Sequence, residues 1–211
     1  MSHDLVYLLQ GAWTTIRISA LATVLGLTVG VAAAVIRQSA IGPLRAVVAV
    51  YVNIVRGTPL FMQILVIYFL FPAAGIDVDR QVAGVMALAV NSGAYISEMI
   101  RGALTSIPRG EIEAAQALAM PNRWIWLRIL LPQVFTLILP PLTIEFAALV
   151  KGSALLSIIG VVELTRSAQQ IISDTFEPLP TWVETAIIYF VICFCLSQVT
   201  RLMQRATGGQ T

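Results

Sequence analysis

Five long apolar stretches, at about 18–36, 46–71, 81–100, 129–150 and 182–200, most constrain what this sequence can fold into. A helix needs roughly 20 mostly apolar residues to cross a bilayer. Only 11% of the 211 residues are charged, whereas a soluble domain carries about 25% charged residues. So little charge cannot cover a water-facing surface. The sequence therefore predicts an all-α integral membrane protein, a single domain over 1–211 with five transmembrane helices.

The predicted connections indicate how the chain lies in the membrane. Residues 4–17 are expected to form an amphipathic lead-in at the interface. Basic residues favour the cytoplasmic side, which predicts an amino terminus outside and a carboxyl terminus inside. The predicted inner side then holds Arg37, Arg45, Arg101, Arg109, Arg123, Arg128, Arg201 and Arg205, and the outer side holds Arg80, Lys151 and Arg166.

Composition and motifs argue against several functions. A net charge of +2 gives no clustered basic face for nucleic acid. Cys193 and Cys195 are two residues apart in an apolar run, which points their side chains to different sides of a helix, so neither a disulfide nor a metal site is expected. The sequence has no Gly-x-x-x-x-Gly-Lys-Ser/Thr phosphate loop. We therefore expect no catalytic residue, metal or cofactor in this chain.

The connection at about 106–123 contains a predicted short helix. Residues 111–118 are rich in strong helix formers, and Pro121 ends the run. Two alanines at its middle, Ala114 and Ala115, would let another surface approach closely. Pattern alone leaves a plain connecting helix as an equal alternative to a docking element.

A family resemblance bears on this choice. Glu113-Ala114-Ala115, followed by a small residue at 119 and by Ile-Leu-Leu-Pro at 129–132, closely resembles the EAA signature of ABC-importer permeases. In that family the loop is a coupling helix that docks into a groove of a cytoplasmic ATPase. The resemblance implies that the coupling residues are Gly110, Glu111, Glu113, Ala114, Ala115 and Ala119. The family has glycine where this chain has Ala119, and alanine disfavours the left-handed turn that a glycine permits there.

Further stretches resemble the polar amino-acid branch of the same family. They lie at 56–60, 92–102, 131–133 and 151–164, and the resemblance extends from about Gly11 to Arg205. It implies a type I importer permease in the bacterial inner membrane that pairs with an identical or homologous permease. Partner ATPases would bind ATP and magnesium, and an extracytoplasmic protein would deliver a polar amino acid. Gly152 replaces the family's usual acidic residue.

Arg56 interrupts the second apolar stretch and is followed by Gly-Thr-Pro. A charge at mid-membrane costs about 2.5–3.5 kcal/mol on insertion scales, and Pro59 frees the carbonyl near Val55. Unwound backbone at membrane depth is tolerated where it lines a wet cavity. Arg56 and Thr58 are therefore candidates for a translocation path. A structural kink with Arg56 paired to an acid is the alternative.

Two more groups of polar residues lie in the apolar stretches. Asn91, Tyr95 and Glu98 share one helical face, which we expect to turn toward a cavity or another subunit, although Glu98 has a local partner in Arg101. Glu145 and Lys151 follow Pro140-Pro141, which predict a break or kink. This acid and base could recognise a zwitterion or hold two permease halves together. The complete candidate path is Arg56, Thr58, Asn91, Tyr95, Glu98, Glu145, Lys151 and Ser153.

The leading hypothesis is thus an ATP-driven importer subunit without chemistry of its own. The alternative is a self-sufficient secondary transporter, driven by an ion gradient through Glu98 and Glu145. The lack of an inverted repeat argues against that alternative.

Overall fold

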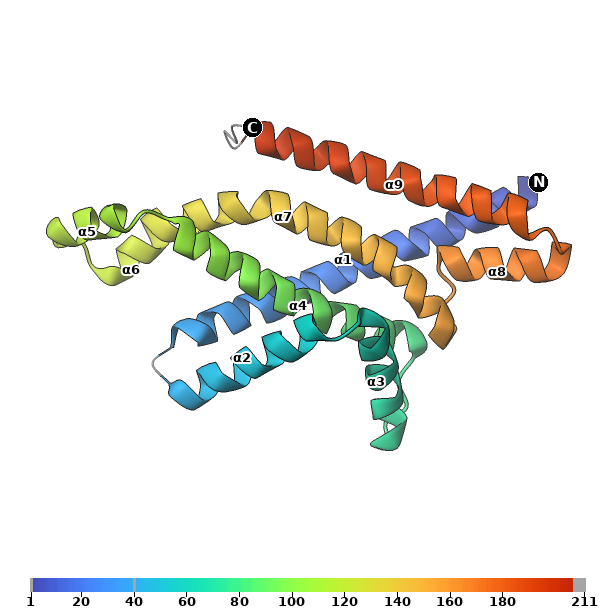
Figure 1. Cartoon of the computed structure of the whole chain (residues 1–211), viewed down its shortest axis with the longest axis horizontal. Helices are drawn as coiled ribbons and strands as arrows, with labels where there is room; N and C mark the ends of the chain where they lie inside the picture. The colour runs from blue at the N-terminus through green and yellow to red at the C-terminus, as the bar shows by residue number, and fades with distance from the viewer. Residues whose placement is uncertain (1, 40, 207–211) are drawn as a thin grey trace.

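The computed structural model describes residues 2–39 and 41–206, and these form helices without a strand (Figure 1). The helices are α1 (Ser2–Gln38), α2 (Gly42–Gly57), α3 (Leu60–Ala73), α4 (Arg80–Ser106), α5 (Arg109–Ala117), α6 (Asn122–Ile125), α7 (Leu131–Gly152), α8 (Leu164–Thr175) and α9 (Pro178–Ala206), with a π-helical turn η1 (Trp126–Leu130) and a 3-10 turn η2 (Ser153–Ile159).

The centre of the fold is the long contact between α1 and α4. Glycines make this contact close. A Cβ atom on Gly30 would lie 2.6 Å from Ile96 Cγ2, and one on Gly93 would lie 2.7 Å from Val29 Cγ1. Small residues at such positions let helix backbones approach each other, which is how helices associate in a membrane.

Helix α1 differs from the sequence prediction at its start. The lead-in predicted to lie at the interface, 4–17, is the first part of one continuous helix. Its apolar side chains Leu8 and Ala12 are buried in a cluster with Leu164, Ala168 and Ile171 of α8. The lead-in is therefore continuous with the first apolar stretch, and α8 covers its face at Leu8 and Ala12.

Among the residues that the structure describes, three helical segments are long and apolar enough to cross a membrane by themselves: Asp4–Gln38, Asn122–Ile159 and Pro178–Gln204. The pair Gly42–Gly57 and Leu60–Ala73 makes a fourth if it is counted as one span. The predicted count of five is not confirmed by this criterion. Helix α4 has 27 residues, about 40 Å at 1.5 Å per residue, but it carries polar residues such as Asn91, Ser92 and Ser97 that are buried inside the bundle. A central helix packed by protein has less need of an apolar surface.

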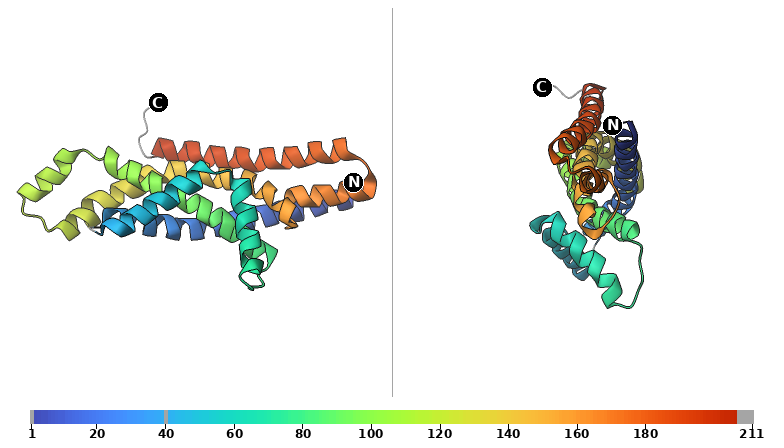
Figure 2. Two further views of the ribbon diagram at one scale, coloured as in Figure 1. Left: turned by 60° about the horizontal axis from the view of Figure 1, so that its bottom comes forward. Right: turned by 90° about the vertical axis from the view of Figure 1, so that its right-hand side faces the viewer.

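The second predicted span is broken. Helices α2 and α3 meet at 117° across Thr58 and Pro59, and Figure 2 shows α3 projecting from the rest of the bundle. The interruption predicted from Arg56-Gly57-Thr58-Pro59 is therefore confirmed.

The fourth predicted span is longer than expected and is not broken. Helical residues continue from Asn122 to Ile159 as one segment, and Pro140 and Pro141 lie inside α7. Figure 1 shows α7 as a gently curved helix. Of the predicted break or kink, the break is absent, because the helix accommodates the two missing N–H donors by bending. After α7 the chain forms η2 and a turn at Gly160, where φ is +83°.

Candidate functional site

The break between α2 and α3 exposes backbone carbonyls that an uninterrupted helix would satisfy. The Thr58 hydroxyl donates to the carbonyl of Ile54 at 2.8 Å, and Gln63 Nε2 donates to the carbonyl of Val55 at 2.7 Å. The freed carbonyl predicted at Val55 is thus present and receives a side-chain donor. The sequence reasoning missed Gln63, although its place one turn after Pro59 was a usable signal.

Gln63 also connects the break to α4. Its Nε2 lies 3.0 Å from both the carbonyl oxygen and the hydroxyl oxygen of Thr58, and its Oε1 accepts from Asn91 Nδ2 at 2.9 Å. Two residues predicted independently, Thr58 and Asn91, are therefore joined through one amide.

A charged cluster lies beside the break. Glu98 Oε1 accepts a hydrogen bond from Arg37, and Glu98 Oε2 accepts one from Arg101 Nη2 at 2.8 Å and lies 3.3 Å from Arg56 Nη1. The Arg56 guanidinium also lies 5.7 Å from the centre of the Tyr95 ring. Both alternatives raised from the sequence are realised, since Arg56 pairs with an acid and Glu98 pairs with Arg101. Arg37 was missed because it comes from a different apolar stretch.

The charge balance of this cluster has a chemical consequence. Three guanidinium groups share one carboxylate, and the Arg56 and Arg101 side chains are 45% and 50% exposed. The cluster keeps an excess of positive charge at an accessible place. Guanidinium groups pair with carboxylates through charge-assisted hydrogen bonds, so this surface suits a passing carboxylate.

The remaining candidates do not join this group. Glu145 is buried in α7, Lys151 is exposed at its end, and within the described ranges neither takes part in an ion pair. The Ser153 hydroxyl is buried and donates to the Val150 carbonyl at 2.9 Å. Glu145 and Lys151 therefore form no combined site for a zwitterion within this chain.

The short helix predicted between two spans is α5, Arg109–Ala117. Gly110, Glu111, Glu113 and Ala114 are exposed, whereas Ala115 is buried against Ile107, Ile125 and Leu130. Ala115 thus packs on its own chain and offers no surface to a partner, contrary to the expectation from the two alanines. Leu118, at the end of α5, is 82% exposed.

Two contacts fix α5 in place. Gln133 of α7 donates to Glu111 Oε2 at 2.6 Å. After the helix, Ala119 adopts a left-handed conformation with φ of +53°, and the Met120 N–H bonds the Ala115 carbonyl at 3.1 Å. This is the turn that the family glycine would permit, so alanine adopts it at a cost of about 1–2 kcal/mol.

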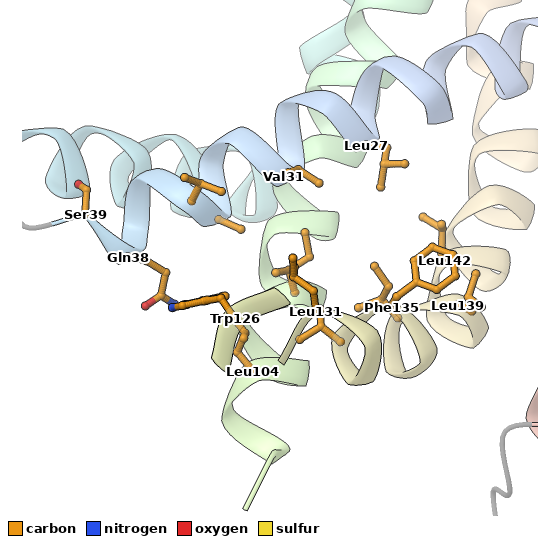
Figure 3. A pocket seen from close by; sticks show the side chains of 15 residues that line it. Leu27, Val31, Gln38, Ser39, Leu104, Trp126, Leu131, Phe135, Leu139 and Leu142 are labelled. Carbon is orange, nitrogen blue, oxygen red and sulfur yellow. The ribbon is translucent and has the colours of Figure 1, made fainter. Parts of the chain in front are cut away.

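A separate apolar cavity of about 1020 Å³ lies between α1, α4, η1 and α7 (Figure 3). Leu27, Val31, Trp126, Phe135 and Leu142 point toward it. Its lining carries no charged side chain in the described part of the chain. The cavity is therefore unsuited to a polar solute, and no residue of the charged cluster lines it.

Comparison with known proteins places the chain in a family. Residues 26–209 match the family described as "Binding-protein-dependent transport system inner membrane component". The chain is 39% identical over 196 residues to the L-cystine transport system permease protein TcyB of Bacillus subtilis (strain 168), covering 92% of this chain and 84% of that protein. It is 38% identical over 201 residues to the glutamine transport system permease protein GlnP of Escherichia coli (strain K12), covering 94% and 91%.

A solved structure agrees. The crystal structure of an amino acid ABC transporter with histidines superposes with a TM-score of 0.91 at 35% identity, covering 95% of this chain and 94% of that chain. The inward-facing MetNI methionine ABC transporter, at 23% identity and a TM-score of 0.74, shows the same fold. This chain therefore belongs to the inner membrane components of binding-protein-dependent transport systems, the permease subunits of ABC importers.

Proposed function

We propose that this chain is the membrane-spanning subunit of an ATP-driven importer that moves polar amino acids across the bacterial inner membrane. The observation that carries the proposal is α5, a short helix that presents the EAA residues Glu113 and Ala114 outward while Ala115 anchors it to the core. A docking element needs both an exposed contact surface and a rigid connection to the part it moves.

The ATPase partner would contact the exposed side of α5. Glu113, Ala114 and Leu118 form this surface, while the Glu111–Gln133 hydrogen bond links the helix to α7. Displacement of α5 would then reach α7 directly. Binding and hydrolysis of ATP with magnesium belong to the partner in this account, and the permease contributes no catalytic group.

The break and the charged cluster would form part of the translocation path. Arg56 and Arg101 supply exposed positive charge for the carboxylate of an amino acid. Thr58 and Asn91 line the polar region next to them. The relatives TcyB and GlnP, which are L-cystine and glutamine transport system permease proteins, support an amino-acid substrate.

The proposed topology places the amino terminus outside and the carboxyl terminus inside. Its five spans are α1, the broken pair α2–α3, α4, the α6–α7 segment and α9, with α5 on the cytoplasmic side. A second permease subunit would complete the path, and an extracytoplasmic binding protein would deliver substrate. The family description, which names binding-protein-dependent transport, supports these partners and favours an ABC importer over a secondary transporter.

Co-purification with the ATPase tests the docking assignment. We expect Glu113→Lys to abolish capture of the ATPase on a tagged permease, because the substitution reverses a charge on the exposed side of α5. Glu177→Lys is the matched control, since Glu177 is an exposed acid beyond α8 that belongs to neither candidate region. Equal capture of the ATPase by both variants would contradict the proposed docking surface.

A further inference from the structure

The Gln63 side chain occupies the angle of the broken span. Its amide nitrogen lies 2.7 Å from the Val55 carbonyl oxygen and 3.0 Å from the Thr58 carbonyl oxygen, on the α2 side of the break. Gln63 itself belongs to the first turn of α3, where its backbone N–H bonds the Pro59 carbonyl at 3.3 Å. One side chain therefore closes the corner between the two helices.

The chemistry of its neighbours fixes the orientation of this amide. The carbonyl oxygens of Val55 and Thr58 only accept hydrogen bonds, so the NH₂ end must face them. Its oxygen then faces the Asn91 Nδ2 donor at 2.9 Å. A flipped amide would place its oxygen against the two carbonyl oxygens and lose these hydrogen bonds. Both the nitrogen and the oxygen of the Gln63 amide therefore take part in hydrogen bonds.

Apolar packing holds each helix on α4 separately, with Val52 and Val55 of α2 in one buried cluster and Ile64 of α3 in another. Gly57 has no atom of another segment within 4 Å of where a Cβ would lie. Ile64 is the buried anchor of α3, packed with Ala87 and Leu88 of α4, but the far end of α3 is exposed at Val66, Phe69 and Leu70. Ile64 holds the base of α3 against α4, and the hydrogen bonds of Gln63 are direct polar contacts between α3 and the end of α2.

We propose that Gln63 is a positioning residue that sets the angle between α2 and α3 and ties this angle to the polar face of α4 through Asn91. The structural part of this inference stands on the contacts alone, and its consequence for uptake rests on the proposed function. A loosened corner would displace Arg56 and Thr58 relative to Asn91 and Glu98, and the candidate path would lose its shape.

Two substitutions separate hydrogen bonding from space filling. Gln63→Glu keeps the size of the side chain but places a carboxylate oxygen against two carbonyl oxygens. Gln63→Met keeps a similar length and has no donor at any pH. The matched control is Gln170→Glu, because Gln170 uses its oxygen to accept from the Tyr7 hydroxyl at 2.6 Å, a bond that a carboxylate retains.

The direct readout is the distance between spin labels at Val50 in α2 and Phe69 in α3, two exposed positions, with Cys193 and Cys195 replaced by serine. We expect both Gln63 variants to broaden the distance distribution and Gln170→Glu to leave it unchanged. We also expect uptake to fall roughly tenfold, because the Val55 and Thr58 carbonyls lose their side-chain donor and the candidate path loses its shape, while the ATPase still co-purifies.

A wild-type distance distribution in both Gln63 variants would overturn the inference. If Gln63→Glu does not fold, Gln63→Met decides the question by the same readout. Different results would contradict this inference and the proposed function. Absence of ATP-driven uptake by the unmodified chain contradicts the proposed function, whereas the label distances report on the corner whether or not the protein transports.

Discussion

The helix α5 and the α2–α3 break are both irregular interruptions between long helices, but they are held in different ways. Helix α5 rests on an apolar cluster through Ala115, with one hydrogen bond from Gln133 to Glu111. The break is held by side-chain hydrogen bonds and by the ion pairs of Glu98. We expect α5 to keep its position when one polar side chain is removed. We expect the break to lose its geometry when any one of its polar side chains is removed.

The largest effect should come from Glu98, which is the one carboxylate shared by three arginines of α1, α2 and α4. Glu98→Ala leaves those guanidinium groups close together without a counter-charge. Breaking such a partly buried pair costs about 3–5 kcal/mol, reduced here because Arg56 and Arg101 are half-exposed. We expect a clear drop in the unfolding midpoint in detergent, with Glu177→Ala as the control. An unchanged midpoint would show that the cluster does not stabilise the break.

Ala115→Leu should have the next largest effect, because it places a larger side chain in the cluster beneath α5. Overpacking of this kind costs typically 1–3 kcal/mol. We expect faster proteolysis within 106–123 and loss of the ATPase. Ala114→Leu, on the exposed side, should also lose the ATPase but keep wild-type proteolysis. Equal proteolysis of both variants would contradict the packing of α5.

A smaller effect is expected from Gln133→Leu, which removes the hydrogen bond to Glu111 but leaves the apolar cluster intact. An exposed hydrogen bond contributes about 0.5–1.5 kcal/mol. The ATPase should still bind, but fewer amino acids should be transported per ATP hydrolysed. An unchanged ratio would mean that α5 acts on the membrane helices through its apolar contacts alone.

The smallest effect should be a stabilisation. Ala119→Gly relieves the left-handed conformation at φ +53° and should stabilise the turn by about 1 kcal/mol. Slower hydrogen exchange of the amides of 115–120 would show this. Ala114→Gly provides the comparison, because Ala114 lies in the middle of α5 and glycine inside a helix destabilises it by roughly 0.5–1 kcal/mol. Slower exchange in both variants would rule out relief of strain at Ala119.

The same contrast explains what the sequence could and could not predict. Helix α5 and the interruption at Arg56-Gly57-Thr58-Pro59 follow from local signals, helix formers bounded by prolines in one case and Gly-Thr-Pro in the other. The shared face of Asn91, Tyr95 and Glu98 follows from helical periodicity, and this face meets the break in the structure.

The partners of these polar groups could not be read from spacing. Arg37 and Gln63 reach the site from other helices, and only the three-dimensional packing of α1 and α3 on α4 brings them there. The covering of residues 4–17 by α8 is likewise a tertiary contact. Pro140 and Pro141 predicted a break or kink without deciding between them, and the packed helix stays continuous and bends.

The most direct test of the central claim is amino-acid uptake into proteoliposomes that contain this chain together with its ATPase and binding protein. The account predicts uptake that requires ATP on the α5 side, stops when the ATPase is omitted, and is insensitive to collapse of ion gradients. Uptake by the permease alone that follows an imposed proton or sodium gradient would contradict it and identify a secondary transporter.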